Sequence, residues 1–245
     1  MQSITRAMTV AKVLAANAAE HGVSISDLSK QCELPLSTMH RLLQAMMKQG
    51  MVEQDEGTKT YRLGTIWLEY GLQVYDTMDY VNKIRPVLEK LMREVDESVY
   101  LSKPVGLEAL VVERIDSENN PIRIVDQLGM RIPMNIGAAN KAMLAAMPRE
   151  KATAILKELL SEEQVLEMQT LLQQIKKQGY ATSHAEKTEG TSSVAVAVVN
   201  GFGDVIGAIS IGFVSFNLTD NRLEFLINKV LEAGNTISEK LGSST

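Results

Sequence analysis

Side chains suited to contact nucleic acid recur along the stretch from Pro35 to Gly50. Polar groups share one side of it and include no carboxylate: Ser37, Thr38, His40, Arg41, Gln44 and Lys48. Guanidinium and amide groups can read base edges in a DNA groove, while hydroxyls, lysines and helix N-terminal amides can hold phosphates. The pattern predicts a DNA-reading face, with an ordinary amphipathic surface helix as the alternative.

A run of small residues, Gly137-Ala138-Ala139-Asn140, precedes another helical pattern. Small side chains leave the backbone amides at the start of a helix accessible, and the helix dipole adds a partial positive charge. This combination predicts a cradle for a carboxylate. The alternative is that these residues only pack against a sheet.

No set of residues has the spacing of a catalytic or metal site. The histidines His21, His40 and His184 are far apart, and the sequence contains no HExxH, paired-cysteine, Walker or dinucleotide-binding motif. Cys32 is the single cysteine, which excludes an internal disulfide. We therefore predict neither enzymatic activity nor a cofactor nor a bound metal.

The polar face is predicted to lie on a helix. Apolar residues recur on the opposite side at the three-and-four spacing of a buried helical face: Met39, Leu42, Leu43 and Met46. Pro35 suits the first helical position, and Gly50 suits the residue just past the end.

Two more helices are predicted before it. Apolar periodicity indicates one from residue 3 to about residue 20. Ser24 and Asp27 have the spacing of a capping box and open a short helix through residues 28–32. The short helix and the Pro35 helix then have helix-turn-helix spacing, and the second of the pair carries the polar face.

A two-stranded hairpin is predicted to follow, from residues 51–54 and 60–63 around a polar turn. Three helices and a hairpin make a winged helix-turn-helix domain, which we assign to residues 1–64. Lys59 and Arg62 on the hairpin are further candidates for DNA contact.

Several blocks of the sequence resemble the IclR family of bacterial transcriptional regulators. Those similar to its DNA-binding domain are Ser3-Ile4-Thr5-Arg6-Ala7, Leu34-Pro35, Ser37-Thr38-Met39-His40-Arg41-Leu42-Leu43 and Tyr61-Arg62-Leu63-Gly64. Those similar to its effector domain are Arg131-Ile132-Pro133-Met134, Lys141-Ala142-Met143-Leu144-Ala145, Gly179-Tyr180-Ala181 with Glu186 and Gly190, and Gly207-Ala208-Ile209-Ser210-Ile211. The order and spacing of these blocks cover nearly the whole chain.

The resemblance implies a GAF-like effector domain that holds a small organic acid. It implies a site at the small-residue run, formed by Gly137, Ala138 and Ala139, with Met134 as an apolar wall and Ser183, Ser193 and Ser210 facing it. The sequence departs from the family pattern at four positions, with Asn140 for Gly, Ser183 for an acid, Ser193 for Cys and Gly212 for a second Ser. A pocket of hydroxyls without the acid is expected to accept a more anionic or differently shaped ligand.

Residues 65–80 are predicted to form a connecting helix that is unusually apolar for a linker. Its aromatic side chains, Trp67, Tyr70 and Tyr75, favour burial against a second copy of the chain, as in a dimer or a dimer of dimers. Packing on their own domain is the alternative.

Residues 81–245 are predicted to form an α+β effector-binding and oligomerisation domain, an antiparallel sheet with flanking helices. A helix from Val81 is kinked or restarted at Pro86. Short strands are expected at 99–101, 107–115, 122–125, 180–185, 193–199 and 205–214. A helical region over 138–177, broken near Pro148 and Ser161, covers the sheet, and a helix over 219–241 closes the domain.

Composition supports a two-domain globular protein. The 245 residues are 45% hydrophobic and 22% charged, with no apolar run long enough to span a bilayer and no signal-peptide pattern, so we expect a cytoplasmic protein. The net charge is −5, yet up to Ile66 basic residues slightly outnumber acidic ones. This distribution favours a small directed DNA contact over nonspecific coating of nucleic acid.

Together these observations predict a sequence-specific DNA-binding repressor whose binding to a double-stranded operator is modulated by a small carboxylic acid. Two alternatives remain at this point. One is a constitutive DNA binder whose second domain only oligomerises. The other is a GAF-like small-molecule binding protein or enzyme with an N-terminal protein-interaction domain.

Overall fold

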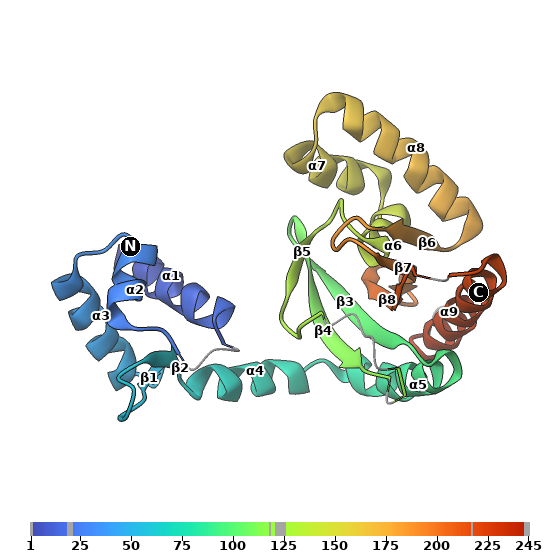
Figure 1. Ribbon diagram of the computed structural model, residues 1–245. Coiled ribbons are helices and arrows are strands. Elements are labelled where there is room, and N and C mark those ends of the chain that lie inside the picture. The colour runs from blue at the N-terminus through green and yellow to red at the C-terminus, as the bar shows by residue number, and fades with distance from the viewer. Residues whose placement is uncertain (1, 19–21, 118, 121–125, 217, 243–245) are drawn as a thin grey trace. The chain divides into compact units, whose positions relative to one another are not determined.

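The computed structural model describes residues 2–18, 22–117, 119–120, 126–216 and 218–242, and it divides the chain into two compact units (Figure 1). The first unit is residues 1–78 and the second is residues 79–245. In the described part of the chain, no helix is both long and apolar enough to cross a membrane.

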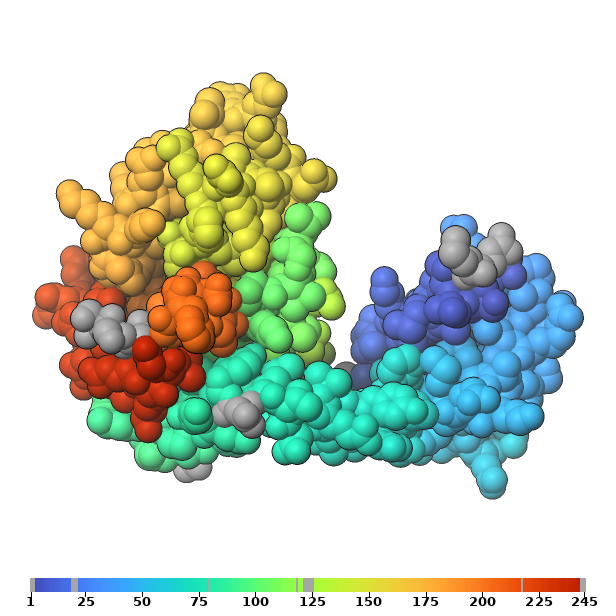
Figure 2. All heavy atoms as spheres, turned by 180° about the vertical axis from the view of Figure 1, so that it is seen from behind, coloured from blue at the N-terminus to red at the C-terminus, as the bar shows by residue number. Residues whose placement is uncertain are grey.

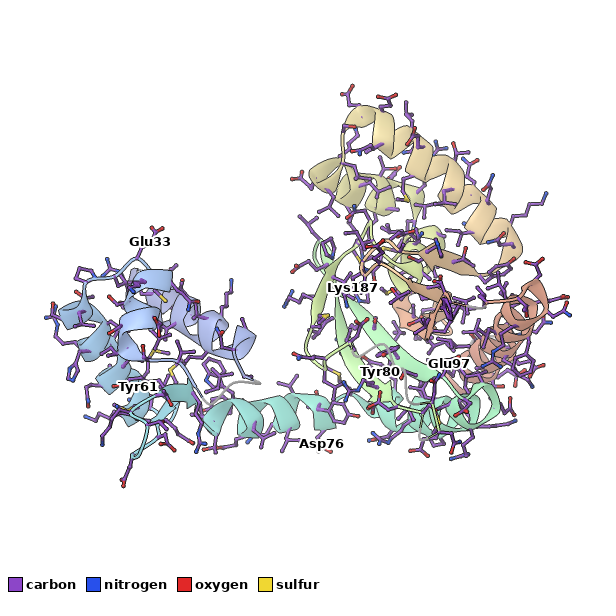
Figure 3. All side chains as sticks on the ribbon, in the orientation of Figure 1. Glu33, Tyr61, Asp76, Tyr80, Glu97 and Lys187 are labelled. Carbon is purple, nitrogen blue, oxygen red and sulfur yellow. The ribbon has the colours of Figure 1, made fainter. Side chains whose placement is uncertain are left out.

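The first unit is the predicted winged helix-turn-helix. Its elements are α1 (Gln2–Ala16), α2 (Ile25–Gln31), α3 (Leu36–Lys48), β1 (Val52–Gln54), β2 (Tyr61–Leu63) and α4 (Ile66–Asp76). Leu28, Met39 and Leu43 are fully buried in its core, and Tyr61 points into it (Figure 3). The first helix ends earlier than predicted, at Ala16, where the side-chain amide of Asn17 donates to the carbonyl of Val13 (2.7 Å).

The turn between α2 and α3 is fixed by local hydrogen bonds. Ser24 caps α2 as predicted, with its hydroxyl oxygen accepting from the amide of Asp27 (3.2 Å). The hydroxyl of Ser29 donates to the carbonyl of Leu34 (2.6 Å), which joins α2 to the residues just before α3. Glu33 completes the turn in the left-handed region, at φ 53°, with an exposed side chain (Figure 3).

The wing returns against the start of the unit. β1 and β2 pair antiparallel, and Tyr61 also exchanges main-chain hydrogen bonds with Val23. After β2 the chain passes so close to the end of α3 that a Cβ on Gly64 would lie 2.0 Å from the carbonyl oxygen of Gly50. A side chain would not fit at position 64, so only glycine lets the chain pass the end of α3 here.

The connecting helix α4 has two parts with different surroundings. The indole of Trp67 packs against the winged core, so for this residue the alternative of packing on its own domain holds. The following side chains are exposed, with Leu68, Tyr70, Leu72 and Val74 at 53–64% of their full accessible area. The atoms of α4, teal in Figure 2, can be followed along the surface.

The second unit is an antiparallel six-stranded sheet with helices on both faces (Figure 1). Its helices are α5 (Asp79–Val95), α6 (Ala138–Ala146), α7 (Arg149–Leu159), α8 (Glu162–Gln178) and α9 (Asp220–Lys240). Its strands are β3 (Ser98–Val105), β4 (Glu108–Ile115), β5 (Arg131–Pro133), β6 (Ala181–His184), β7 (Thr191–Val199) and β8 (Val205–Val214), in the order β5-β4-β3-β8-β7-β6.

Alternation along the strands assigns side chains to the two faces. Ala195 and Ala208 lie in the core shared with α6, α7 and α8. Val196 faces α9. A Cβ on Gly234 of that helix would lie 2.6 Å from the Val196 side chain. Small residues therefore let α6 and α9 approach the central strands from opposite sides.

Several predicted boundaries change. The strand expected at 99–101 is longer than predicted, because Lys103, Pro104 and Val105 continue β3 and pair with β4. β3 pairs with β8 only as far as Ser102, so the missing N–H of Pro104 costs no hydrogen bond on that side. β5 was not predicted because three residues give no periodicity. The strand expected at 122–125 lies outside the described residues. The helix breaks at Pro148 and Ser161 are confirmed, whereas Pro86 lies inside a single helix, α5.

Candidate DNA-binding surface and ligand cavity

The predicted polar face of α3 forms one exposed surface. Ser37, His40, Arg41, Gln44 and Lys48 are all exposed, and Thr38 is half-buried at its edge. Met39, Leu43 and Met46 are buried on the opposite side. No acidic residue lies in the helix, so the surface presents donors and positive charge without a competing carboxylate.

The start of α3 adds main-chain donors to this surface. Pro35 caps the helix and has no side chain able to accept from it. The amides of Thr38 and Met39 bond to the carbonyl of Pro35, but those of Leu36 and Ser37 precede the first intrahelical bond. Amides in this position bind phosphate oxygens well, because the helix dipole points the same way.

The wing carries two basic residues, one with an exposed surface position and one that forms an ion pair with a glutamate. Lys59 lies at the hairpin turn with φ 58° and an exposed side chain. Arg62 forms an ion pair with Glu53 (3.3 Å), whose other oxygen accepts from the amide of Thr65 (3.1 Å). Arg62 thus belongs partly to the hairpin's own structure, although its side chain is 66% exposed.

Asp55 shapes the wing turn. One of its carboxylate oxygens accepts from the amides of Gly57 (3.0 Å) and Thr58 (2.7 Å) and from the Thr58 hydroxyl (2.9 Å). These hydrogen bonds, led by that from the Thr58 amide, hold the pKa of Asp55 below its usual value. The turn that carries Lys59 is therefore built on an ionised carboxylate at neutral pH.

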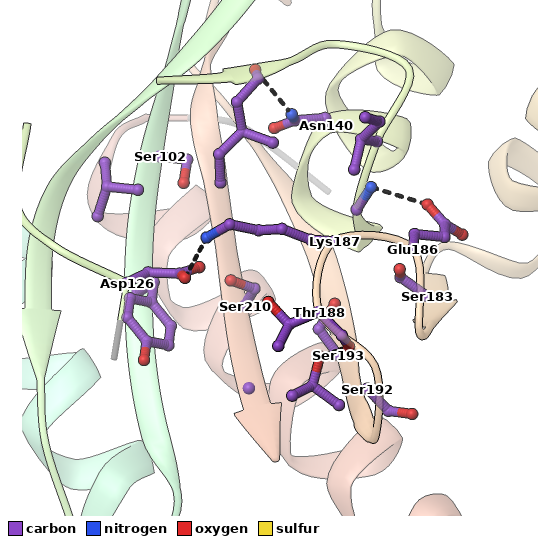
Figure 4. A pocket seen from close by; sticks show the side chains of 17 residues that line it. Ser102, Asp126, Asn140, Ser183, Glu186, Lys187, Thr188, Ser192, Ser193 and Ser210 are labelled. Atoms are coloured by element: carbon purple, nitrogen blue, oxygen red, sulfur yellow. Dashed lines mark hydrogen bonds and ion pairs between the residues drawn. The ribbon is translucent and has the colours of Figure 1, made fainter. Parts of the chain in front are cut away.

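The second unit contains a cavity of about 80 Å³ between the start of α6 and strands β3, β7 and β8 (Figure 4). The structure brings four of the predicted effector residues together on its wall: Gly137, Ser183, Ser193 and Ser210. The other three do not line it. Met134, which follows β5, and Ala138, the first residue of α6, are buried in the core beneath α6, and Ala139 packs against that core.

Two residues that sequence reasoning gave no role hold the start of α6. The carboxylate of Glu186 accepts from the main-chain N–H of Gly137 (2.8 Å) with Oε2 and forms an ion pair with Lys141 through Oε1. The Lys141 side chain is only 5% exposed. A carboxylate therefore does lie at the start of α6, and it belongs to the chain's own Glu186.

Asn140 explains one departure from the family pattern. Its side-chain amide donates to the carbonyls of Ile132 (3.2 Å) and Pro133 (2.9 Å), which fixes β5 to the first turn of α6. Asn140 is 2% exposed and lines the cavity wall. A glycine at this position could not make these two hydrogen bonds.

A second ion pair crosses the cavity. Lys187 bonds to Asp126 (Figure 4). Its ammonium also lies 3.0 Å from the sulfur of Met130. Tyr100 lines the same wall, and burial raises the pKa of its phenol. Glu186 and Lys187 are neighbours in sequence, so one loop carries opposite charges to opposite walls. Their partners lie 45 and 61 residues away, which is why spacing alone gave no signal.

No group of three or more His, Cys, Asp and Glu side chains suited to a metal ion occurs among the described residues. The chemistry of the cavity is instead that of hydroxyls, an amide and two ion pairs, which can bind a polar anion by hydrogen bonds and charge.

Comparison with known proteins identifies both halves of the chain. Residues 3–56 match the IclR helix-turn-helix domain, and residues 72–239 match the family described as bacterial transcriptional regulator IclR C-terminal. The chain is 32% identical over 227 residues to the HTH-type transcriptional regulator KipR of Bacillus subtilis (strain 168), covering 90% of each protein. It is 28% identical over 226 residues to the HTH-type transcriptional repressor AllR of Escherichia coli (strain K12), covering 89% of this chain and 83% of AllR.

A solved structure with the same fold is that of an IclR transcriptional regulator from Alicyclobacillus acidocaldarius. Its TM-score is 0.81 at 21% identity, and the match covers 98% of each chain. The predicted fold is thereby confirmed over both units, and the two family matches confirm the resemblance noted in the sequence. This chain belongs to the IclR family of bacterial transcriptional regulators.

Proposed function

We propose that this regulator binds a two-fold DNA operator through α3 and that a small carboxylic acid in the second unit alters that binding. The exposed, carboxylate-free face of α3 in a helix-turn-helix carries the proposal. In this proposal, residues 1–64 bind DNA, residues 65–80 connect the two domains, and residues 81–245 bind the ligand and oligomerise. Because the proposed target is a DNA operator, we also propose that the protein acts in the cytoplasm.

Direct readout is assigned to the centre of the α3 face. Arg41 and Gln44 have side chains that can bond two acceptors or an acceptor and a donor on one base edge. Phosphate contacts position the helix without reading sequence. We assign them to Ser37, Thr38, Lys48 and the wing lysine Lys59. His40 lies between the two groups.

The exposed side chains of α4 support assembly. Leu68, Leu72 and Val74 expose more than half of their area, which is unusual for three large apolar residues on one short helix. We propose that they pack against a second copy, which would also double the number of phosphate contacts. A dimer or a dimer of dimers would then bind a two-fold operator.

The ligand is proposed to be a small organic acid. The cavity offers the hydroxyls of Ser183, Ser193 and Ser210 on one side and the carboxylate position at Gly137 on the other. The relative AllR is a repressor by name, and we extend that role to this chain as part of the proposal.

The test is a DNA fragment selected by the protein from random sequence and measured by gel shift at fixed salt. Each of a panel of small carboxylic acids is then added. We expect saturable binding and at least one acid that changes the affinity. A protein that selects no sequence, or that binds its selected fragment equally with every acid, would contradict the corresponding half of the proposal.

A further inference from the structure

We propose that Glu186 is a built-in competitor of the ligand: it occupies the carboxylate position of the cavity in the unliganded protein, and an acid binds by replacing it. This inference rests on the proposed function, because it concerns how the same cavity is regulated. Its basis is the arrangement of Glu186, Gly137 and Lys141.

The contacts of Glu186 are those that a free carboxylate would make. One oxygen accepts from the main-chain amide of Gly137 at 2.8 Å, and the other pairs with the ammonium of Lys141. Both donors belong to the start of α6, where the helix dipole favours an anion. Any small acid that enters the cavity meets this position already filled.

The two partners of this ion pair differ in how easily they can leave. Lys141 lies on a helix buried against the sheet, and its side chain is 5% exposed. Glu186 lies in the loop between β6 and β7, its side chain is 32% exposed, and the residues around it from 185 to 190 are exposed as well. The carboxylate can therefore swing into water while the cation stays in place.

Burial of the cation sets the class of ligand. A buried ammonium without a counter-ion is costly, so Glu186 leaves only when another anion takes its position. An acid restores the charge balance and a neutral molecule of the same shape does not. The exchange thus selects carboxylates without any additional cation in the cavity.

The size of the cavity leads to the same conclusion. Its volume of about 80 Å³ is well below the roughly 300–1,000 Å³ typical of small-molecule sites. Withdrawal of the Glu186 side chain would enlarge it from the α6 side. Because Lys187 is the next residue and bonds to Asp126 across the cavity, withdrawal of Glu186 would also displace the loop that spans both walls.

The test uses propionate, which is the glutamate side chain as a free acid, and propionamide, its neutral counterpart. Binding to the full chain is measured by titration calorimetry for the wild type, for Glu186→Ala, and for the control Glu189→Ala. Glu189 is an exposed glutamate of the same loop, so the control removes the same charge from the same segment.

We expect Glu186→Ala to bind propionate at least about fivefold more tightly than the wild type, because the site no longer has to be vacated first. Glu189→Ala should match the wild type, and propionamide should bind none of the three. Equal propionate affinity in the wild type and Glu186→Ala would overturn the proposal, as would tight binding of propionamide.

A second variant covers the case in which Glu186→Ala fails to fold. Glu186→Gln keeps the length of the side chain and an oxygen for the Gly137 amide but removes the charge opposite Lys141. Propionate should raise the thermal unfolding temperature of Glu186→Gln more than that of the wild type at equal ionic strength. An equal rise in both proteins would refute the exchange.

Failure of the exchange and failure of the proposed function give different results. If propionate binds Glu186→Ala more tightly than the wild type but leaves DNA binding unchanged, the exchange is supported and the effector role of the cavity is refuted. If an acid alters DNA binding at the same concentration in the wild type and in Glu186→Ala, the effector role is supported and the exchange is refuted.

Discussion

The indole Nε1 of Trp67 donates a hydrogen bond to the main-chain carbonyl of Met51, 2.8 Å away. Met51 directly precedes β1, and Trp67 is the second residue of α4. This bond anchors the first turn of α4 to the winged domain, so the direction of α4 is set by that domain. The exposed apolar residues further along α4 are then presented by the winged unit itself.

Substitution of Leu72 tests whether those residues pair two chains. Leu72→Glu places a charge in the proposed interface, and light scattering should show the mass falling toward that of one chain. Gln73→Glu is the matched control, because it adds the same charge at the adjacent exposed position and should leave the mass unchanged. An unchanged mass for Leu72→Glu would remove α4 from the proposed interface.

Trp67 itself should affect stability and not assembly. Trp67→Phe keeps an aromatic ring on the winged core but removes the donor to Met51. The loss is expected to be about 0.5–1.5 kcal/mol in the unfolding of the first unit, measured by chemical denaturation. The mass should stay that of the wild type.

The α3 face is tested by separating base readout from phosphate contact. Arg41→Ala should cost about 1–3 kcal/mol for the selected sequence and relax discrimination at one base pair. Lys48→Ala should weaken all sequences alike and reduce the dependence of affinity on salt. Both residues are exposed, so the fold should not change. Arg41→Ala with unaltered affinity in a gel shift at fixed salt would exclude Arg41 from readout.

Asp55 predicts a pH dependence of the wing. Its folded pKa is lowered, so its contribution is present above the unfolded pKa and is lost as the pH falls through the folded pKa. The Thr58 amide signal, followed by NMR, should therefore titrate below the pH expected for a free aspartate. Asp55→Ala should abolish that titration and weaken DNA binding through a misplaced Lys59, while Glu56→Ala in the same turn should do neither.

The elements that sequence reasoning located well are those with a strong local signal. Ser24, Ser161 and Pro148 mark helix starts by their own chemistry, and the structure places helix boundaries at each of them. The predictions that missed a strand or a strand end have a common cause. β5 exists only because it pairs with β4, and Pro104 stays in β3 because the pairing of β3 with β8 stops at Ser102, before the proline is reached.

The site shows the same division between local and long-range signals. The start of α6 could be predicted as an anion position because small residues before a helix are a local feature. That Glu186 fills it could not be read from spacing, since the contact joins residues 45 and 49 positions apart. Met134 and Ala138 illustrate the converse, because the family resemblance assigned both to the site but their side chains are buried in the core and do not line the cavity.

The turn before α3 offers a stabilising change. Glu33 adopts φ 53° with a side chain for which the structure shows no ion pair among the described residues. Glycine accepts this conformation without the steric cost of a Cβ, so Glu33→Gly should stabilise the first unit by up to about 1 kcal/mol. The control Ala45→Gly, at an exposed position inside α3, should destabilise it by a similar amount. Denaturant unfolding that showed a loss for both variants would refute the left-handed strain assigned to Glu33.

The serine wall of the cavity is tested by removing one hydroxyl. Ser210 lies on β8, is 7% exposed and lines the cavity. Ser210→Ala keeps the shape of the wall and removes one donor, so the affinity of an effector acid should fall by about 0.5–1.5 kcal/mol, or more if the hydroxyl bonds to a carboxylate. DNA affinity without the acid should stay normal, because the DNA-reading surface belongs to the other unit.

Ser215→Ala is the matched control for that change. The Ser215 hydroxyl bonds to that of Ser192 (2.7 Å) just beyond the end of β8 and does not line the cavity. It should therefore leave ligand affinity unchanged. A further variant, Ser193→Leu, should fill the space between β7 and α6 and abolish the response, since Ser193 faces the same cavity from the neighbouring strand. If Ser210→Ala and Ser215→Ala weaken the acid equally, or if Ser193→Leu still responds, the hydroxyls only pack the sheet and the ligand binds elsewhere.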